Sequence, residues 1–148
     1  MSANQINKSV LLPYQAQQMY ALVERIEDYP RFLPWCSGAQ VERDDPEVVV
    51  ATVRIDYLGL KQSFTTRNHN TPGERISLEL VDGPFTQLDG LWQFEDIGPS
   101  GCKVQFALDY TMRSGILGRA LAPVFGKITG TMVDAFVQEA YRRYGDNG

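Results

Sequence analysis

The sequence predicts an α+β fold in which a curved antiparallel sheet of about six or seven strands wraps around a long C-terminal helix. Three observations predict it. Residues 47–112 alternate apolar and polar side chains with a period of two. Turn-forming residues interrupt that alternation at regular intervals. Residues 115–144 then return to helical spacing, so the expected order is β-α(α)-β meander-α.

Size and composition are those of one soluble domain covering residues 1–148. A chain of 148 residues can bury a core of ordinary density, and 43% hydrophobic with 22% charged residues is a typical globular balance. The net charge of −4 (14 basic minus 18 acidic residues) argues against broad phosphate binding, and no DNA partner is expected. No export signal or long apolar run is visible, which predicts a cytoplasmic location.

The N-terminal segment predicts a strand followed by a short helix. Residues 4–12 are rich in strand formers and end at Pro13. The next stretch, 16–26, repeats apolar residues on one helical face, although no good N-cap side chain precedes it. This helix must end before Pro30, because the residue ahead of a proline disfavours the α region.

The stretch DYPRFLPWC, residues 28–36, gathers aromatic side chains at a chain break. Tyr29, Phe32 and Trp35 stand among two prolines, and a short turn or second helix is expected through residues 30–35. A curved sheet closed over one helix leaves an apolar gap between them. We therefore interpret this stretch as a lid on one end of that gap.

The alternating centre of the chain predicts five strands with one buried and one solvated face. They are EVVVATVRIDY (47–57), LKQSFTTRN (60–68), ERISLELVD (74–82), FTQLDGLWQFED (85–96) and CKVQFALDYTM (102–112). Turn signals lie at Asp45-Pro46, Gly59, Thr71-Pro72-Gly73, Asp82-Gly83-Pro84 and residues 98–101. The inward positions are mostly apolar: Val53, Ile55, Phe64, Leu78, Leu80, Trp92, Phe94 and Phe106. Arg54 and Arg67 fall on the opposite face.

The last segment carries one apolar stripe along a predicted helix. The stripe comprises Leu117, Leu121, Phe125, Ile128, Met132, Phe136 and Ala140. Pro123 predicts a kink, or a helix that starts near it. Gly115, Gly118, Gly126 and Gly130 are unfavourable inside a helix, and we expect them to leave room beneath it.

Four motifs resemble the coenzyme-Q-binding START-like family of the polyketide cyclase/START superfamily, which includes mitochondrial coenzyme Q chaperones and bacterial ribosome-association toxins of the RatA type. They are YPRFLPWCSGAQV, KQSFTTRN, LELVDGPFTQLDGLWQFED and MVDAFVQEAYRRYG, and the similarity runs from about residue 6 to residue 144. The resemblance implies a helix-grip fold, also called START-like. It further implies a hydrophobic tunnel between sheet and helix that accepts a lipophilic quinone.

The resemblance makes non-catalytic binding of ubiquinone, in support of respiration, the leading hypothesis. No covalent cofactor is expected. Pro34 and Trp35 would form the tunnel mouth, where an aromatic face can stack on a quinone ring, and Phe85 would face the cavity. The full set of expected tunnel residues is Phe32, Pro34, Trp35, Phe64, Leu80, Phe85, Trp92, Val124, Phe125, Ile128 and Met132. The alternative is that these side chains form an ordinary hydrophobic core without a ligand.

Two alternatives come from other members of the superfamily. A ribosome-association toxin would bind the large ribosomal subunit and block subunit joining; its basic contacts would be Arg119, Lys127, Arg142 and Arg143. A cyclase or aromatase would need an acid/base pair inside the cavity, whereas the inward positions are mostly apolar, so a non-enzyme is expected. Peripheral membrane contact is a further expectation for a quinone carrier.

Metal and thiol chemistry are not expected. His69 is the single histidine, which excludes a site built from several histidines. Cys36 and Cys102 lack CxxC spacing and are expected to be inert thiols of a reduced protein. Cys36 also has no basic neighbour that would lower the pKa of its thiol.

Overall fold

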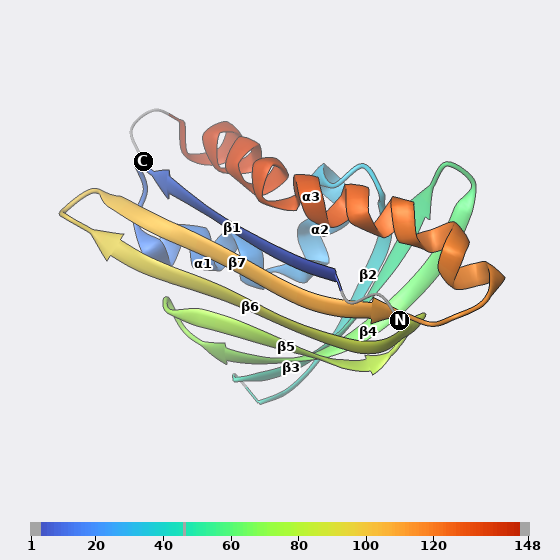
Figure 1. Cartoon of the computed structure of the whole chain (residues 1–148). Coiled ribbons are helices and arrows are strands. Elements are labelled where there is room, and N and C mark those ends of the chain that lie inside the picture. The colour runs from blue at the N-terminus through green and yellow to red at the C-terminus, as the bar shows by residue number, and fades with distance from the viewer. Residues whose placement is uncertain (1–3, 46, 146–148) are drawn as a thin grey trace.

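The computed structural model describes residues 4–45 and 47–145, and it has the predicted architecture. A seven-stranded antiparallel sheet in the order β1-β7-β6-β5-β4-β3-β2 curves around helix α3, and α1 and α2 lie between the sheet and the C-terminal half of α3 (Figure 1). The elements are β1 (Asn4–Leu12), α1 (Ala16–Glu24), the 3₁₀ turn η1 (Ile26–Asp28), α2 (Tyr29–Phe32), β2 (Cys36–Asp45), β3 (Val48–Tyr57), β4 (Leu60–Thr71), β5 (Arg75–Asp82), β6 (Phe85–Ile97), β7 (Gly101–Met112) and α3 (Ile116–Tyr144).

The strands form the predicted antiparallel meander. Each strand from β2 to β7 pairs with the next one in the chain, and β1 closes the order by pairing with β7. Trp92 on β6 lies opposite Ile76 on one side and Phe106 on the other, so large apolar side chains meet on the concave face. Arg54 and Arg67 are exposed on the convex face, as predicted. The period-two pattern therefore identified the buried face correctly.

Strand β2 is the element that the alternation did not reveal. Residues 36–45 form an edge strand beside β3, with register shifts between Cys36 and Gly38 and between Arg43 and Asp45. Two irregularities within ten residues break the period of two on which the strand assignment relied. Pro46, in the predicted turn after this strand, lies outside the described residues.

Helix α1 ends at Glu24, ahead of Pro30, as predicted. The expectation that the residue before Pro30 avoids the α region is wrong. Tyr29 lies in that region, with φ −55° and ψ −40°. Pro30 occupies the first turn of α2, where a backbone N–H has no intrahelical partner to lose. Packing holds Tyr29 in place, since its ring meets Phe136 edge-on at 5.3 Å between centroids.

Helix α3 runs unbroken through Pro123, so the expectation of a helix starting near that proline is wrong. Leu117 is 52% exposed and does not belong to the buried stripe, which begins at Leu121. Gly118 packs directly on the chain before the helix: a Cβ at that position would lie 1.8 Å from the carbonyl oxygen of Arg113. This close approach explains a glycine at a position where helix propensity disfavours it.

By length and composition alone, α3 would be long and apolar enough to cross a membrane. The same test is passed by core helices, and here the apolar stripe of α3 packs on the sheet. Its buried residues include Phe125, Ile128 and Phe136. In this fold α3 therefore has one face buried on the core and one exposed face.

Candidate functional site

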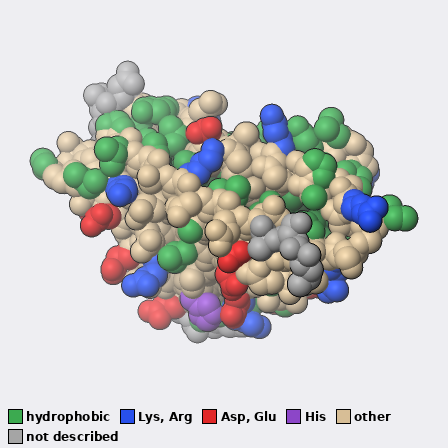
Figure 2. All heavy atoms as spheres, viewed as in Figure 1, with side chains coloured by type: hydrophobic (Ala, Val, Ile, Leu, Met, Phe, Trp, Pro, Cys, Tyr) green, Lys and Arg blue, Asp and Glu red, His purple; other side chains and the backbone are tan. Residues whose placement is uncertain are grey.

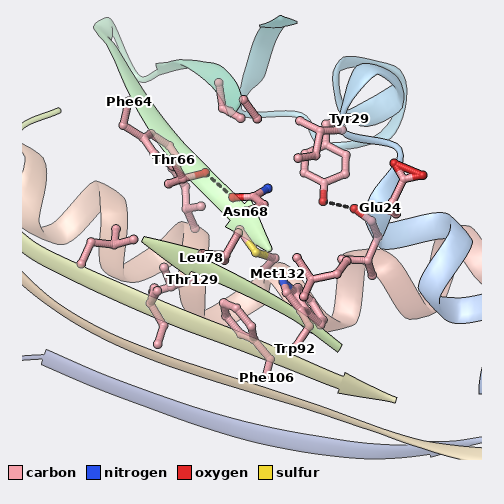
Figure 3. A pocket seen from close by; sticks show the side chains of 18 of the residues that line it. Glu24, Tyr29, Phe64, Thr66, Asn68, Leu78, Trp92, Phe106, Thr129 and Met132 are labelled. Carbon is pink, nitrogen blue, oxygen red and sulfur yellow. Dashed lines mark hydrogen bonds between the residues drawn. The ribbon is translucent and has the colours of Figure 1, made fainter. Parts of the chain in front are cut away.

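A cavity of about 80 Å³ separates the concave face of the sheet from α3, and Figure 3 shows it from close by. The volume accommodates several water-sized groups, which suits one ring or a slender chain. Most lining side chains are apolar. The lining residues are Val23, Glu24, Ile26, Tyr29, Trp35, Val49, Ala51, Val53, Phe64, Thr66, Asn68, Asn70, Ile76, Leu78, Leu88, Trp92, Phe106, Leu108, Phe125, Ile128, Thr129 and Met132.

One wall of the cavity is aromatic and comes from β6 and β7. The rings of Trp92 and Phe106 are tilted against each other with centroids 4.3 Å apart, and both are almost fully buried. Leu78 from β5 and Met132 from α3 lie beside them (Figure 3). A flat or aliphatic ligand would find many apolar contacts on this wall.

The N-terminal helices close the opposite side. Tyr29 donates a hydrogen bond of 2.5 Å to the carbonyl oxygen of Val23, and burial raises the pKa of Tyr29 far above its usual value, so the phenol stays protonated. The carbonyl oxygen of Trp35 accepts a 2.9 Å bond from the N–H of Asp56, which fixes the lid to β3. The interpretation of residues 28–36 as a cover for the gap agrees with this geometry.

A polar strip on β4 faces into the cavity and was missed by sequence reasoning. We define it as Thr66, Asn68 and Asn70, which are 6%, 2% and 6% exposed. The hydroxyl of Thr66 donates to Oδ1 of Asn68 at 2.7 Å, whereas Oδ1 of Asn70 has no hydrogen-bond partner in the described part of the chain. The signal was available, because these residues continue the inward register that Phe64 begins, two positions at a time.

The structure brings together only part of the predicted tunnel set. Six of the predicted residues line the cavity, namely Trp35, Phe64, Trp92, Phe125, Ile128 and Met132. Phe32, Pro34, Leu80, Phe85 and Val124 do not line it. Pro34 is exposed, so it forms no cavity wall, and Phe32 packs on Phe136 with ring centroids 5.4 Å apart.

The remaining differences lie beneath the N-terminal half of α3. Phe85 and Val124 line a separate pocket of about 10 Å³ with Leu121. Phe85 and Phe125 meet at 4.8 Å between ring centroids, and this contact helps to fill the space at that end. Gly126 and Gly130 do not line the main cavity, so the room expected beneath the glycines is not where the cavity lies.

The ionisable side chains that line the cavity already have partners. Glu24 accepts a 2.9 Å bond from Arg43, and Tyr29 donates to Val23. What the lining offers a guest is apolar surface and the polar strip. Such an arrangement can bind and orient a small lipophilic molecule.

The four predicted basic contacts fall into two groups. Arg119 and Lys127 are exposed on α3, and neither forms an ion pair within residues 4–45 and 47–145. Arg142 and Arg143 both donate to the carboxylate of Glu139. These hydrogen bonds hold the pKa of Glu139 below its usual value, and the bond from Arg142 contributes most. Figure 2 shows hydrophobic and basic side chains at its right-hand end, over the N-terminal half of α3. Arg119 and Lys127 are thus the two that remain available to a partner.

The two cysteines and the single histidine lie apart from one another, on different strands. Burial raises the pKa of both thiols, that of Cys102 to about 11, which keeps them protonated. His69 is exposed beside Glu79 on the convex face. Among the described residues, no group of three histidine, cysteine or acidic side chains is placed to hold a metal ion.

Comparisons with known proteins agree with this fold. The family described as "Polyketide cyclase / dehydrase and lipid transport" matches residues 12–137. The ribosome association toxin RatA of Pseudomonas aeruginosa is 41% identical over 95% of this chain and 97% of that protein. The mitochondrial coenzyme Q-binding protein COQ10 homolog B of Xenopus laevis is 25% identical over 94% of this chain and 59% of that protein. The crystal structure of the Zhui aromatase/cyclase from Streptomyces covers 99% of each chain with a TM-score of 0.85 at 14% identity, a likeness of fold alone.

Proposed function

Because this chain belongs to the polyketide cyclase / dehydrase and lipid transport family, with bacterial RatA proteins among its relatives, we propose that it associates with the ribosome. The observation that carries the proposal is 41% identity along nearly the whole length of a protein named as a ribosome association toxin. In this proposal the chain binds the large subunit and hinders subunit joining, in the cytoplasm. The more distant quinone-binding relative has weaker support, at 25% identity.

The exposed face of α3 is the surface we assign to this contact. From its first residue to Val133 the helix contains two charged side chains, Arg119 and Lys127, and both are basic. Ile116 is 87% exposed and Leu117 52% exposed beside them. Cations for phosphate groups together with apolar side chains for protein or bases suit a ribonucleoprotein partner, despite the net charge of −4.

Sedimentation tests the proposal directly. Purified protein is mixed with small subunits, large subunits or intact ribosomes and separated on sucrose gradients at graded salt. We expect it in the large-subunit fraction at low salt and steeply less as salt rises, together with fewer intact ribosomes. Its absence from every ribosomal fraction at low salt would contradict the proposal.

The apolar cavity favours a second function, the non-catalytic holding of a lipophilic small molecule such as ubiquinone. A polyprenyl or alkyl chain gains about 0.8 kcal/mol for each CH₂ that it buries, and the wall of Trp92, Phe106 and Leu78 offers such burial. The lining supports binding without a reaction, because Glu24 and Tyr29 already have partners. Contact with a membrane, from which such a ligand would come, stays a prediction.

Organic extraction of the purified protein followed by mass spectrometry tests this second function. We expect a bound lipophilic molecule in the extract, or binding of added ubiquinone measured by quenching of tryptophan fluorescence. Repeated preparations that carry no such molecule and take none up would remove it. The ribosome experiment is independent, so each function can stand without the other.

A further inference from the structure

The polar strip of β4 differs from the strands on either side of it. Thr66, Asn68 and Asn70 occupy three successive inward positions, where the neighbouring strands β3 and β5 place Ala51, Ile76 and similar apolar side chains. Carboxamides are rarely buried without full hydrogen bonding. The unpaired Oδ1 of Asn70 therefore calls for a partner that the described residues do not supply.

The hydrogen bonds of Thr66, Asn68 and Asn70 determine which of their polar groups remain free to bind a ligand. The bond from Thr66 orients Asn68 with Oδ1 toward that hydroxyl, which directs the amide nitrogen of Asn68 away from it (Figure 3). Asn70 is held by its backbone, whose N–H donates 2.8 Å to the carbonyl oxygen of Glu47. Asn70 is one of the residues that line the cavity, and its buried Oδ1 has no hydrogen-bond partner among the described residues. The strip thus presents an acceptor on Asn70 and a donor on Asn68, two positions apart on the same face of β4.

We propose that the cavity takes a lipophilic molecule that carries a hydroxyl group and places this hydroxyl on Asn70 and Asn68. The proposal rests on the cavity-binding function above and names its ligand class. A hydroxyl donates and accepts at once, so it can give its hydrogen to Oδ1 of Asn70 and accept from the amide nitrogen of Asn68. A quinone carbonyl only accepts and leaves Oδ1 unpaired. A phenol or hydroquinone therefore fits better than a quinone or a hydrocarbon.

The apolar wall fixes the orientation of the guest. Leu78 lies beside the strip as the cross-strand neighbour of Asn68. Together with Trp92 and Met132, which also line the cavity (Figure 3), it would contact the ring or chain of the ligand. With its hydroxyl on β4 and its apolar body on β5, β6 and α3, the molecule would satisfy both sides of the site. Specificity would come from the hydroxyl, because an unpaired buried carboxamide opposes a ligand that lacks it.

A matched pair of ligands tests the proposal. Dissociation constants for para-nonylphenol and nonylbenzene are measured by quenching of tryptophan fluorescence on the full chain, on Asn70→Leu and on Asn7→Leu. Asn7 is exposed on β1, so it controls for the same substitution away from the cavity. We expect the unsubstituted protein and Asn7→Leu to bind the phenol about tenfold more tightly than the hydrocarbon. In Asn70→Leu this preference should fall to about twofold or less, with nonylbenzene bound at least as well as before.

The outcomes separate the ligand class from the binding function. Equal affinity of the unsubstituted protein for both ligands would overturn the hydroxyl proposal while cavity binding stands, and this comparison decides even if Asn70→Leu fails to fold. A phenol preference that persists in folded Asn70→Leu would also overturn it. Binding of neither ligand would refute the cavity function itself and the proposal with it.

Discussion

The carboxylate of Asp96, on β6, accepts a hydrogen bond of 2.8 Å from the backbone N–H of Ala16, the first residue of α1. An acidic side chain at a helix N-terminus satisfies one free N–H and interacts favourably with the helix dipole. The sequence before α1 offers no good capping side chain, and a strand eighty residues further along the chain supplies it. Gln18 assists locally, since its Oε1 accepts a 2.8 Å bond from the N–H of Gln15.

Replacement of Asp96 by alanine should therefore destabilise the protein although the residue lies outside the core. We expect a loss of about 0.5–2 kcal/mol in the free energy of unfolding, the usual cost of removing a capping side chain. Urea denaturation followed by circular dichroism measures it. Glu95→Ala, an exposed neighbour on the same strand, should change stability by less than about 0.5 kcal/mol. Equal effects of the two substitutions would contradict the capping role.

Glycines in α3 should respond to alanine in opposite directions. A Cβ on Gly118 would lie 1.8 Å from the carbonyl oxygen of Arg113, so Gly118→Ala must displace the backbone and should cost about 1–3 kcal/mol. A Cβ on Gly126 would meet no described atom within 4 Å apart from its chain neighbours and the adjacent backbone of α3. Gly126→Ala should therefore stabilise by up to about 1 kcal/mol through helix propensity. Thermal melting of the two variants side by side checks the sign. A stabilising Gly118→Ala would show that the close contact does not hold in solution.

Substitution of Glu139 should remove a pH-dependent part of the stability. Arg142 and then Arg143 lower the pKa of Glu139, so its contribution is complete above the unfolded pKa of about 4.3 and is lost as pH falls through the lower folded pKa. Glu139→Gln should therefore cost about 1–2 kcal/mol at neutral pH and progressively less in acid. Urea titrations of both proteins between neutral pH and about pH 3 measure the difference, with Glu95→Gln as control. A difference that does not shrink in acid would argue against the ion pairs.

Reversal of charge on α3 should weaken ribosome association. The pair Arg119→Glu and Lys127→Glu replaces two exposed cations that have no ion pair within the described part of the chain. We expect a loss of co-sedimentation at low salt and a shallower salt dependence, because fewer counterions are released. The matched control, Arg54→Glu with Arg75→Glu, makes the same change of charge on the convex face of the sheet and should bind as the unsubstituted protein does. Equal losses in both would indicate a general charge effect.

Filling of the cavity should block ligand binding with little effect on folding. Leu78→Phe adds volume on the apolar wall, and we expect the affinity for para-nonylphenol to fall about tenfold or more, measured by fluorescence quenching. Leu80 follows at the next inward position of β5 but does not line the cavity. Leu80→Phe is therefore the control and should bind within about threefold of the unsubstituted protein. Stronger effects from Leu80 would move the binding site toward the other end of the sheet.

Most of the architecture followed from the sequence alone, because buried strands and helices impose short periods on neighbouring residues. The alternation of Val49, Ala51, Val53 and Ile55 predicted the inner face of β3. The same alternation, up to Tyr110, predicted the inner face of β7. The strand β2 escaped because its register shifts interrupt that period. Periodicity reports which face is buried wherever it is uninterrupted.

Tertiary packing alone decided where the cavity lies and which residues line it. Phe85 and Trp92 are both aromatic residues of one predicted strand. In the fold Phe85 lines a separate pocket with Val124 while Trp92 lines the main cavity, because their places depend on how α3 crosses the sheet. The cap from Asp96 and the contact between Gly118 and Arg113 likewise join elements whose meeting no local pattern encodes. Local chemistry thus determined the elements and their buried faces. The distances between elements, which set the site, exist only once the chain has folded.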